Sequence, residues 1–168
     1  MKRSAVLLPM ALAMTALGGL VAPPAASANT AAVVFTCSEA GSEEVLLTYS
    51  VSVTAPAVVR KGKPIALTVS ATKPAPADIP AGGIAGQMQV VLGGAGSGSV
   101  TATGLTNAVA VPIGQPMLLG PGSATATVAN TGVVTFKPGT FTMSIWIGTT
   151  LTCTLPSGGP VLASTVVV

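Results

Sequence analysis

The sequence predicts an all-β domain, an antiparallel β-sandwich of about eight or nine strands that follows a cleaved signal peptide. Three observations lead to this prediction. Valine and threonine are abundant, and no run beyond the first residues has helical apolar spacing. Several stretches alternate apolar and polar residues with a period of two, which is typical of strands with one buried face. The 20 glycines and 14 prolines separate these stretches at short intervals.

Residues 1–28 have the pattern of an export signal. Lys2 and Arg3 precede an apolar run over residues 5–21, and Ala26-Ser27-Ala28 supplies small residues for cleavage. A membrane anchor is the alternative, but a run of about 17 residues is at the short limit for a span. We therefore expect a secreted protein, with a single β-sandwich domain over residues 29–168 and no transmembrane segment after signal removal.

The two cysteines, Cys37 and Cys153, lie near the two ends of this domain. In an exported protein such a pair favours a disulfide. A free thiol pair and metal ligation are the alternatives, and metal ligation has little support because the sequence has no histidine and no third cysteine. Closing a loop of ~100 residues stabilises a fold by as much as 4–5 kcal/mol in the chain-entropy model.

The clearest predicted strand spans residues 45–54, whose odd-numbered residues, Tyr49 and Val51 among them, fall on one buried face. Residues 64–72 and 141–153 form two more, the second with a bend or bulge expected at Gly148. Trp146, one residue off the apolar face, is expected on the second face or at an edge. Weaker candidates are 33–37, 87–92, a hairpin of 99–103 with 107–111, the pair 123–129 and 133–136 around a tight turn, and 162–168.

Two proline-rich stretches, residues 73–86 and 112–122, are predicted as loops. Long loops often carry binding functions, which makes each a candidate binding loop. A stiff, inert connection is the favoured interpretation of both.

Residues 29–168 carry few groups that perform chemistry. They contain no histidine, the usual base for serine acyl transfer, and four carboxylates, Glu39, Glu43, Glu44 and Asp78. Glycoside hydrolysis needs two carboxylates that face each other, whereas Glu43 and Glu44 are adjacent and would point to opposite faces of a strand. No calcium-loop pattern is present. We therefore expect no catalytic residues, no metal site, no cofactor and no enzymatic activity.

The charge of residues 29–168 is close to balanced, because five cations meet four carboxylates. Arg60, Lys61 and Lys63 form the local basic patch, and no aromatic residues alternate with them, so we expect no nucleic-acid binding. A solvated turn is the favoured interpretation, and contact with an anionic cell-wall polymer is the alternative.

The low charge density also leaves little electrostatic repulsion between copies of the chain. Self-association is therefore a further hypothesis, with the exposed edge of a strand at residues 165–168 as its candidate contact. Pairing of that strand inside its own sheet is the favoured interpretation.

Several short motifs resemble those of a known group of proteins. They are Phe35-Thr36-Cys37 and the segments 51–56, 59–65, 136–141 and 151–154. These are similar to secreted β-sandwich proteins of high-GC actinobacteria, a family of unknown function with one early and one late cysteine. The resemblance spans most of residues 33–168 and implies an immunoglobulin-like fold and export, but no established activity.

Together, the residues and the resemblance predict a secreted, non-catalytic extracellular or cell-envelope domain with a binding or structural role. Its expected partner is a cell-wall polymer or a second copy of itself. A self-associating surface protein and a secreted enzyme inhibitor are the alternatives.

Overall fold

The computed structural model describes residues 26–39, 42–156 and 158–168. Within these ranges the chain forms strands and no helix, which confirms the all-β prediction. The predicted export signal lies outside the described residues except for residues 26–28, which begin the first strand. The ten strands are β1 (Ala26–Glu39), β2 (Val45–Pro56), β3 (Val58–Val59), β4 (Pro64–Pro74), β5 (Ile84–Gly94), β6 (Ser99–Thr106), β7 (Pro116–Thr127), β8 (Gly132–Ile145), β9 (Thr150–Thr154) and β10 (Ala163–Val167).

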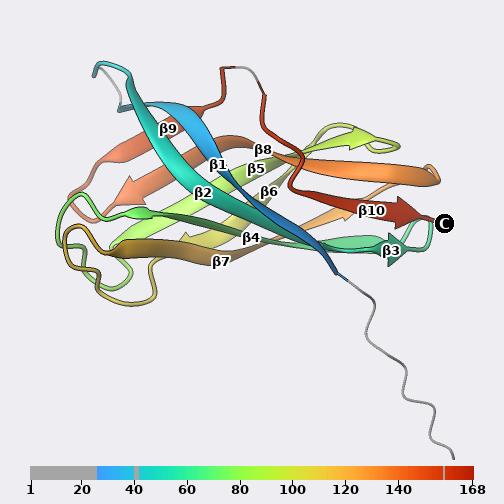
Figure 1. Cartoon of the computed structure of the whole chain (residues 1–168), viewed down its shortest axis with the longest axis horizontal. Coiled ribbons are helices and arrows are strands. Elements are labelled where there is room, and N and C mark those ends of the chain that lie inside the picture. The colour runs from blue at the N-terminus through green and yellow to red at the C-terminus, as the bar shows by residue number, and fades with distance from the viewer. Residues whose placement is uncertain (1–25, 40–41, 157) are drawn as a thin grey trace, which may run out of the picture.

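Hydrogen bonds join all ten strands into one sheet with the order β3-β10-β8-β5-β6-β7-β4-β2-β1-β9. A further pairing of β8 with β9 closes the sheet on itself, and β10 and β3 continue beyond β8. The closed sheet is flattened into two layers, with β1, β2, β4 and β7 in one and β5, β6 and β8 in the other (Figure 1). The two layers agree with the predicted sandwich, but its two separate sheets are instead continuous, and its immunoglobulin-like character is not confirmed.

Two joints make the sheet continuous. Strand β9 pairs with β1 on one side and with β8 on the other, so it bridges the layers at one edge. At the other edge β6 meets β7 through a single pair, Thr103 and Ser123. Periodicity shows which side chains of a strand are buried, but it carries no information about which strands cross between layers.

The C-terminal strand is paired on both sides. Residues Ala163–Val167 pair antiparallel with β8. Val166 and Val167 also pair with Val58 and Val59 of β3, and this is a parallel pair in an otherwise antiparallel sheet. The favoured interpretation, a terminal strand that pairs inside its own sheet, is therefore confirmed. The hypothesis of an exposed strand edge at residues 165–168 is wrong.

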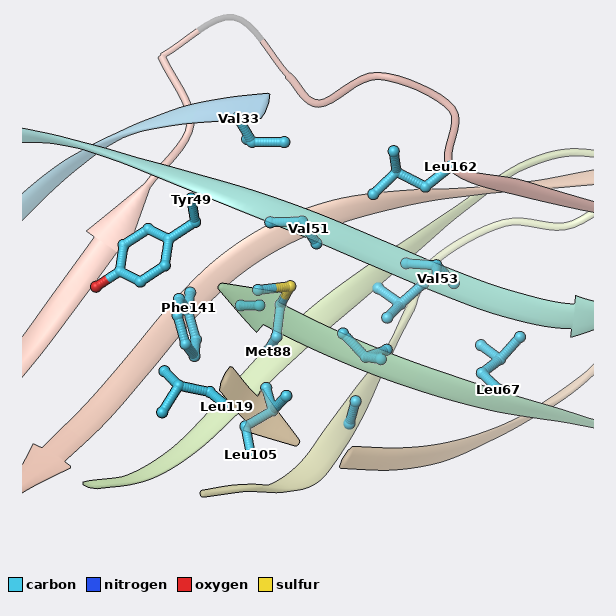
Figure 2. Packing of buried hydrophobic residues seen from close by; sticks show 14 of the residues in the cluster. Val33, Tyr49, Val51, Val53, Leu67, Met88, Leu105, Leu119, Phe141 and Leu162 are labelled. Carbon is cyan, nitrogen blue, oxygen red and sulfur yellow. The ribbon is translucent and has the colours of Figure 1, made fainter. Parts of the chain in front are cut away.

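Buried side chains from both layers form one hydrophobic core (Figure 2). The alternation in β2 holds, since Tyr49, Val51 and Val53 are buried. Tyr49 packs with Phe35 and Phe141, and the three ring centroids lie 5.5–6.2 Å apart. Aromatic pairs at such distances stabilise a fold beyond the burial of their surface. These rings therefore connect β1, β2 and β8 in the interior.

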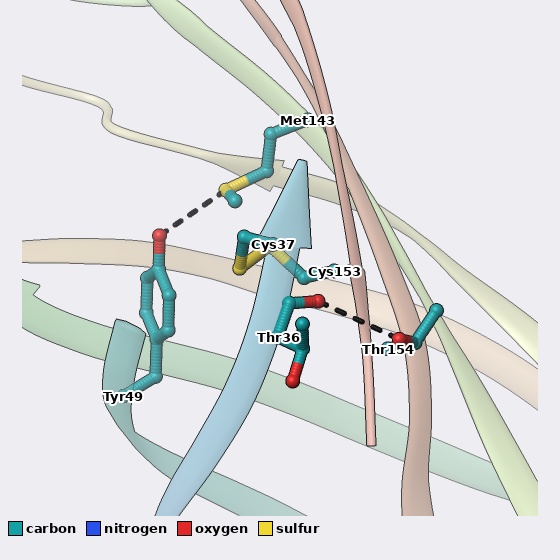
Figure 3. The surroundings of a disulfide bond; sticks show 6 residues. All are labelled: Thr36, Cys37, Tyr49, Met143, Cys153 and Thr154. Carbon is teal, nitrogen blue, oxygen red and sulfur yellow. Dashed lines mark hydrogen bonds between the residues drawn. A yellow bond between two sulfur atoms is a disulfide. The ribbon is translucent and has the colours of Figure 1, made fainter. Parts of the chain in front are cut away.

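Cys37 of β1 and Cys153 of β9 are register partners and form a disulfide across 116 residues of sequence. Both cysteines are fully buried, and Cys153 also pairs with Phe141 of β8. Beside them, the Thr154 hydroxyl donates to the Thr36 carbonyl oxygen at 3.5 Å (Figure 3). The bond confirms the predicted disulfide, in place of free thiols or metal ligands, and it lies where the sheet closes.

The predicted strand over residues 141–153 is two strands joined by a turn. Strand β8 runs through the predicted strand 133–136 and on to Ile145, and β9 starts at Thr150. Gly148 has a φ of +89° and its N–H donates to the Ile145 carbonyl oxygen at 2.9 Å, so it forms a reverse turn and no bulge. Trp146 and Ile147 continue the apolar pattern through this turn, which explains the wrong prediction.

Four other predictions differ from the structure. Residues 107–111 form a loop with one isolated bridge, between Val111 and Ile79, and no hairpin with β6. Strand β7 begins at Pro116, inside the predicted loop 112–122, and the predicted loop 73–86 shortens to residues 75–83. The segments 123–129 and 133–136 are not partners, because β7 pairs with β4 and β6 while β8 pairs with β5, β9 and β10.

The prolines and glycines of β7 explain why the sequence predicted a loop over residues 112–122. They usually indicate a loop, but Pro116 and Pro121 lie within this strand. Gly122 is there because β6 passes close to it: an added Cβ would lie 3.0 Å from the Thr103 carbonyl oxygen and 2.9 Å from Leu105 Cγ. The glycine therefore marks the contact between the layers.

Candidate functional site

The predicted basic contact forms an exposed turn between β3 and β4. The side chains of Arg60, Lys61 and Lys63 are all exposed, and the structure keeps the three residues together. The Lys63 N–H donates to the Arg60 carbonyl oxygen at 3.0 Å, and the Lys61 N–H donates to Val168 O at 2.7 Å. The geometry agrees with a solvated turn, and contact with an anionic polymer stays a prediction.

The four carboxylates are exposed and do not gather into one cluster. Glu39 ends β1, Glu43 and Glu44 precede β2, and Asp78 lies in the β4–β5 loop. Asp78 Oδ1 accepts a hydrogen bond from the Ile113 N–H at 2.8 Å, which joins two loops. Among the described residues, no three histidine, cysteine, aspartate or glutamate side chains lie close enough together to hold a metal ion.

A pocket of about 330 Å³ opens at one end of the sandwich, where β4 and β8 end and β2, β7 and β9 begin. This volume lies within the usual range for small-molecule sites, roughly 300–1,000 Å³. We call it the apolar pocket, because eleven of its lining residues are apolar side chains and the other two are Tyr49 and Lys73. The eleven are Leu47, Pro76, Ala77, Ile79, Ile84, Met117, Met143, Ile145, Trp146, Ile147 and Leu151.

A wider hollow of about 630 Å³ lies beside the apolar pocket, between Asp78 and Pro112. It is formed by the two neighbouring loops alone and has six lining residues. The apolar pocket draws its walls from six strands and two connecting segments, so both layers of the sandwich support it. We therefore take the smaller pocket as the candidate site.

Lys73 is the one charged residue among the described residues that line the apolar pocket. It lies near the end of β4, paired with Met117 of β7, which is also a lining residue. Its Nζ atom lies 5.4 Å from the centre of the Tyr49 ring, within the range of a cation–π interaction. Burial lowers the pKa of the Lys73 ammonium from its usual value. The pocket thus combines apolar walls with a single cation.

Tyr49 forms part of the inner wall. Its hydroxyl donates to Met143 Sδ at 3.7 Å, and thioether sulfur is a weak acceptor (Figure 3). Burial raises the pKa of Tyr49 to about 12. The phenol is therefore neutral at physiological pH and contributes a ring face and a satisfied hydroxyl to the wall.

A buried asparagine holds the loops beside the pocket. The Asn107 Nδ2 donates to the carbonyl oxygens of Pro80, at 2.6 Å, and Val109, at 3.0 Å. Its Oδ1 accepts from the Ile84 N–H at 2.9 Å. One side chain thereby joins the 75–83 loop, the 107–115 segment and the start of β5. The sequence placed Asn107 in a strand, and nothing in its neighbourhood signalled this role.

Two apolar side chains of the pocket lining are also exposed to solvent. Trp146 and Ile147 line the pocket, yet 47% and 68% of their surfaces remain exposed. The Trp146 N–H donates to the Gly83 carbonyl oxygen at 2.8 Å, which ties the β8–β9 turn to the β4–β5 loop. In the neighbouring loop, Val109 and Ile113 are also largely exposed. Exposed apolar residues that gather beside a pocket, as Trp146 and Ile147 do, often mark interaction sites.

Sequence reasoning had pointed only to parts of this site. Residues 73–86 were a candidate binding loop, and that range contains Lys73 and the 75–83 loop. No local sequence pattern predicted the apolar pocket as a whole, because its lining residues are spread over residues 47–151 and come together only when the sheet closes.

Comparisons of the chain with protein-family models, with curated protein sequences and with solved structures found no match. Across residues 26–39, 42–156 and 158–168, there is no helix with the length and apolar character needed to cross a lipid bilayer. The geometry of the apolar pocket, its rim and the basic turn is therefore the basis for a functional proposal.

Proposed function

We propose that this chain is a secreted, non-catalytic binding domain of the bacterial cell envelope, and that the apolar pocket with its Trp146–Ile147 rim forms its binding surface. The observation that carries the proposal is the exposure of these two large apolar side chains beside a pocket of ligand-binding size. Exposed apolar residues that lie together mark interaction sites, and aromatic residues are enriched in protein interfaces.

Export is supported by two features. The pattern of residues 1–28 matches a signal peptide. The buried Cys37–Cys153 disulfide is typical of proteins that fold outside the reducing cytosol. An envelope component is therefore within reach of the folded domain.

The basic turn offers a separate, weaker contact. Lys63 precedes β4 and Lys73 lies near its end, so the turn and the apolar pocket lie at opposite ends of this strand. Exposed lysines and arginines attract anionic polymers mainly through screened electrostatics. Such a contact would weaken as salt is added, whereas apolar contacts at the pocket would persist. The two surfaces are thus separable by ionic strength.

Self-association through strand pairing has less support. The strand that the sequence offered as a sticky edge, β10, has a partner on each side. Strand β9 ends the sheet order, and it also has a partner on each side, because it pairs with β8 as well as with β1. Paired edges leave fewer free main-chain groups for another chain.

Co-sedimentation tests the proposal. The purified, oxidised protein is mixed with isolated actinobacterial cell envelopes or with insoluble glycans, beside a tube with no ligand. We expect pelleting with an envelope fraction that resists added salt, and no pelleting alone. Ile147→Ser should lower the bound fraction at least threefold, because it removes an exposed apolar contact. Val133→Ser, at an exposed position on β8 outside the pocket, should leave it unchanged.

Two outcomes would contradict the proposal. A protein that stays soluble in every tube has no envelope partner. A protein that pellets equally without ligand assembles with itself, which would favour the self-associating surface protein instead.

A further inference from the structure

We infer that the apolar pocket binds an anionic amphiphile: a single straight apolar chain of about eight carbons whose carboxylate pairs with the Lys73 ammonium. The inference deepens the proposed function and rests on it, because it names the chemical class of ligand for the same site. Lys73, the pocket volume and the two methionines in its wall carry the argument.

The volume sets the size of the ligand. A water-sized group occupies about 30 Å³. A pocket of about 330 Å³ therefore accommodates a chain with the bulk of ten or eleven such groups. Octanoate, with ten non-hydrogen atoms, matches this size, whereas a sugar of similar size would leave its hydroxyls facing apolar walls without partners. Buried polar groups without hydrogen bonds are costly.

The charge sets the head group. None of the described lining residues is a carboxylate, and Lys73 is the sole cation among them. The Tyr49 ring faces the Lys73 ammonium at 5.4 Å, and a ring face neutralises no charge. An incoming carboxylate would supply an anion that none of the described lining residues offers this partly buried ammonium, and a charged hydrogen bond of this kind is stronger than a neutral one. A cationic or neutral ligand would leave the ammonium desolvated and unpaired.

The position of Lys73 sets the orientation. Its side chain is half-buried, whereas Met117 and Met143 are buried deeper in the same pocket. The carboxylate therefore sits at the mouth, in reach of Lys73 and water, and the chain points toward the two methionines. Methionine is a suitable wall for a flexible chain, because its unbranched thioether adapts to irregular surfaces.

The pocket is braced before any ligand enters. The three hydrogen bonds of Asn107 and the bond from Trp146 to Gly83 hold the neighbouring loops. A preformed site loses less conformational entropy on binding. Binding should therefore proceed without rearrangement of the strands.

Methionine-methyl NMR tests the inference on the purified, oxidised protein. Of the six methionines, Met88, Met117 and Met143 lie in the described residues, and Met88 is buried in the core outside the pocket lining. Octanoate, kept below its micelle concentration, should shift the Met117 and Met143 methyl signals saturably and leave Met88 unchanged. Trp146, the single tryptophan, should report the same binding curve through its fluorescence.

Three probes and two variants isolate the role of Lys73. Octanoate should bind at least tenfold more tightly than octanol, and octylammonium should bind more weakly than either. Lys73→Met keeps the apolar stem and removes the charge, so octanoate affinity should fall at least tenfold, while octanol affinity should not fall. Lys63→Met, the matched loss of a lysine in the exposed turn at the other end of β4, should bind octanoate like the unmodified chain.

Equal affinity for octanoate and octanol, or shifts at Met88 as large as those at Met117, would overturn the inference. Lack of any octanoate binding would overturn it too. Retention by envelope fractions in co-sedimentation would, in that last case, still stand as support for the proposed function, so the two failures are distinguishable.

Discussion

Raising the pH above 10 should destabilise this fold through Tyr49. Burial raises the pKa of Tyr49 from 10.0 to about 12, so the unfolded chain releases the phenolic proton at a lower pH than the folded chain does. Folding stability from this group is thus fully present below pH 10 and is lost as the pH rises through 12. With 1.36 kcal/mol for each pKa unit, the loss is about 1.4 kcal/mol at pH 11 and approaches a limit of about 2.7 kcal/mol.

The chain suits this measurement because Tyr49 is its single tyrosine. Tyrosinate absorbance of the folded protein therefore follows one group, and its midpoint should lie near 12. Urea unfolding at pH 8 and pH 11 gives the free energy of unfolding of the unmodified chain and of the Tyr49→Phe variant. The lysines titrate in both proteins and cancel in the difference. The phenylalanine variant should gain about 1.4 kcal/mol relative to the unmodified chain between the two pH values.

Two results would refute this reasoning. A tyrosinate midpoint near 10 in the folded protein would mean that water reaches the Tyr49 hydroxyl. A stability difference between the two proteins that stays constant from pH 8 to pH 11 would mean that the folded and unfolded states bind this proton equally.

Three further predictions concern packing and closure, and urea unfolding measures each. Phe141→Ala, in the aromatic cluster, should cost about 3–5 kcal/mol, whereas Val133→Ala at an exposed position of the same strand should cost less than 1 kcal/mol; equal costs would contradict the assigned core. Replacing Cys37 and Cys153 together by alanine should cost as much as 5 kcal/mol, since the two cysteines are 116 residues apart, and an unchanged midpoint would show that the bond does not stabilise the fold. Asn107→Ala should cost about 1–3 kcal/mol by leaving the Ile84 N–H unpaired, and Asn107→Asp should be at least as harmful, because its second oxygen would face the Pro80 and Val109 carbonyl oxygens; a neutral alanine variant would show that water replaces the side chain.

Strands with a strict alternation were predictable from the sequence. In β2 the apolar odd-numbered residues Tyr49, Val51 and Val53 are all buried, because the pleat places every second side chain on the core face. The disulfide was also predictable, since an exported chain with two cysteines leaves few other roles for them. These features depend on local spacing or on simple counts.

The differences arise where tertiary contacts decide the local structure. Trp146 and Ile147 are apolar but sit in a turn, since the chain reverses at Gly148 to place β9 between β8 and β1. Pro121 and Gly122 lie in a strand because β7 pairs with β4 and β6, and residue 122 is glycine because β6 approaches too closely for a side chain there. No local pattern reports these long-range contacts.

The candidate site belongs to the same category. Lys73 is one of several lysines in the sequence, and only the fold places its ammonium over the Tyr49 ring inside an apolar pocket. Asn107 likewise gains its role from Pro80 and Ile84, which are distant in sequence. The basic turn was predictable because its residues are adjacent in sequence, as the pocket residues are not.

Hydrogen exchange of the oxidised protein, with and without the envelope fraction that retains it, tests the binding surface most directly. Amide protection on binding should appear in the 75–83 loop and the 146–149 turn, and the 60–63 turn should exchange at an unchanged rate in high salt. Protection confined to residues 60–63, or to β3 and β10, would contradict the apolar pocket as the binding surface and place the contact at the opposite end of the sandwich.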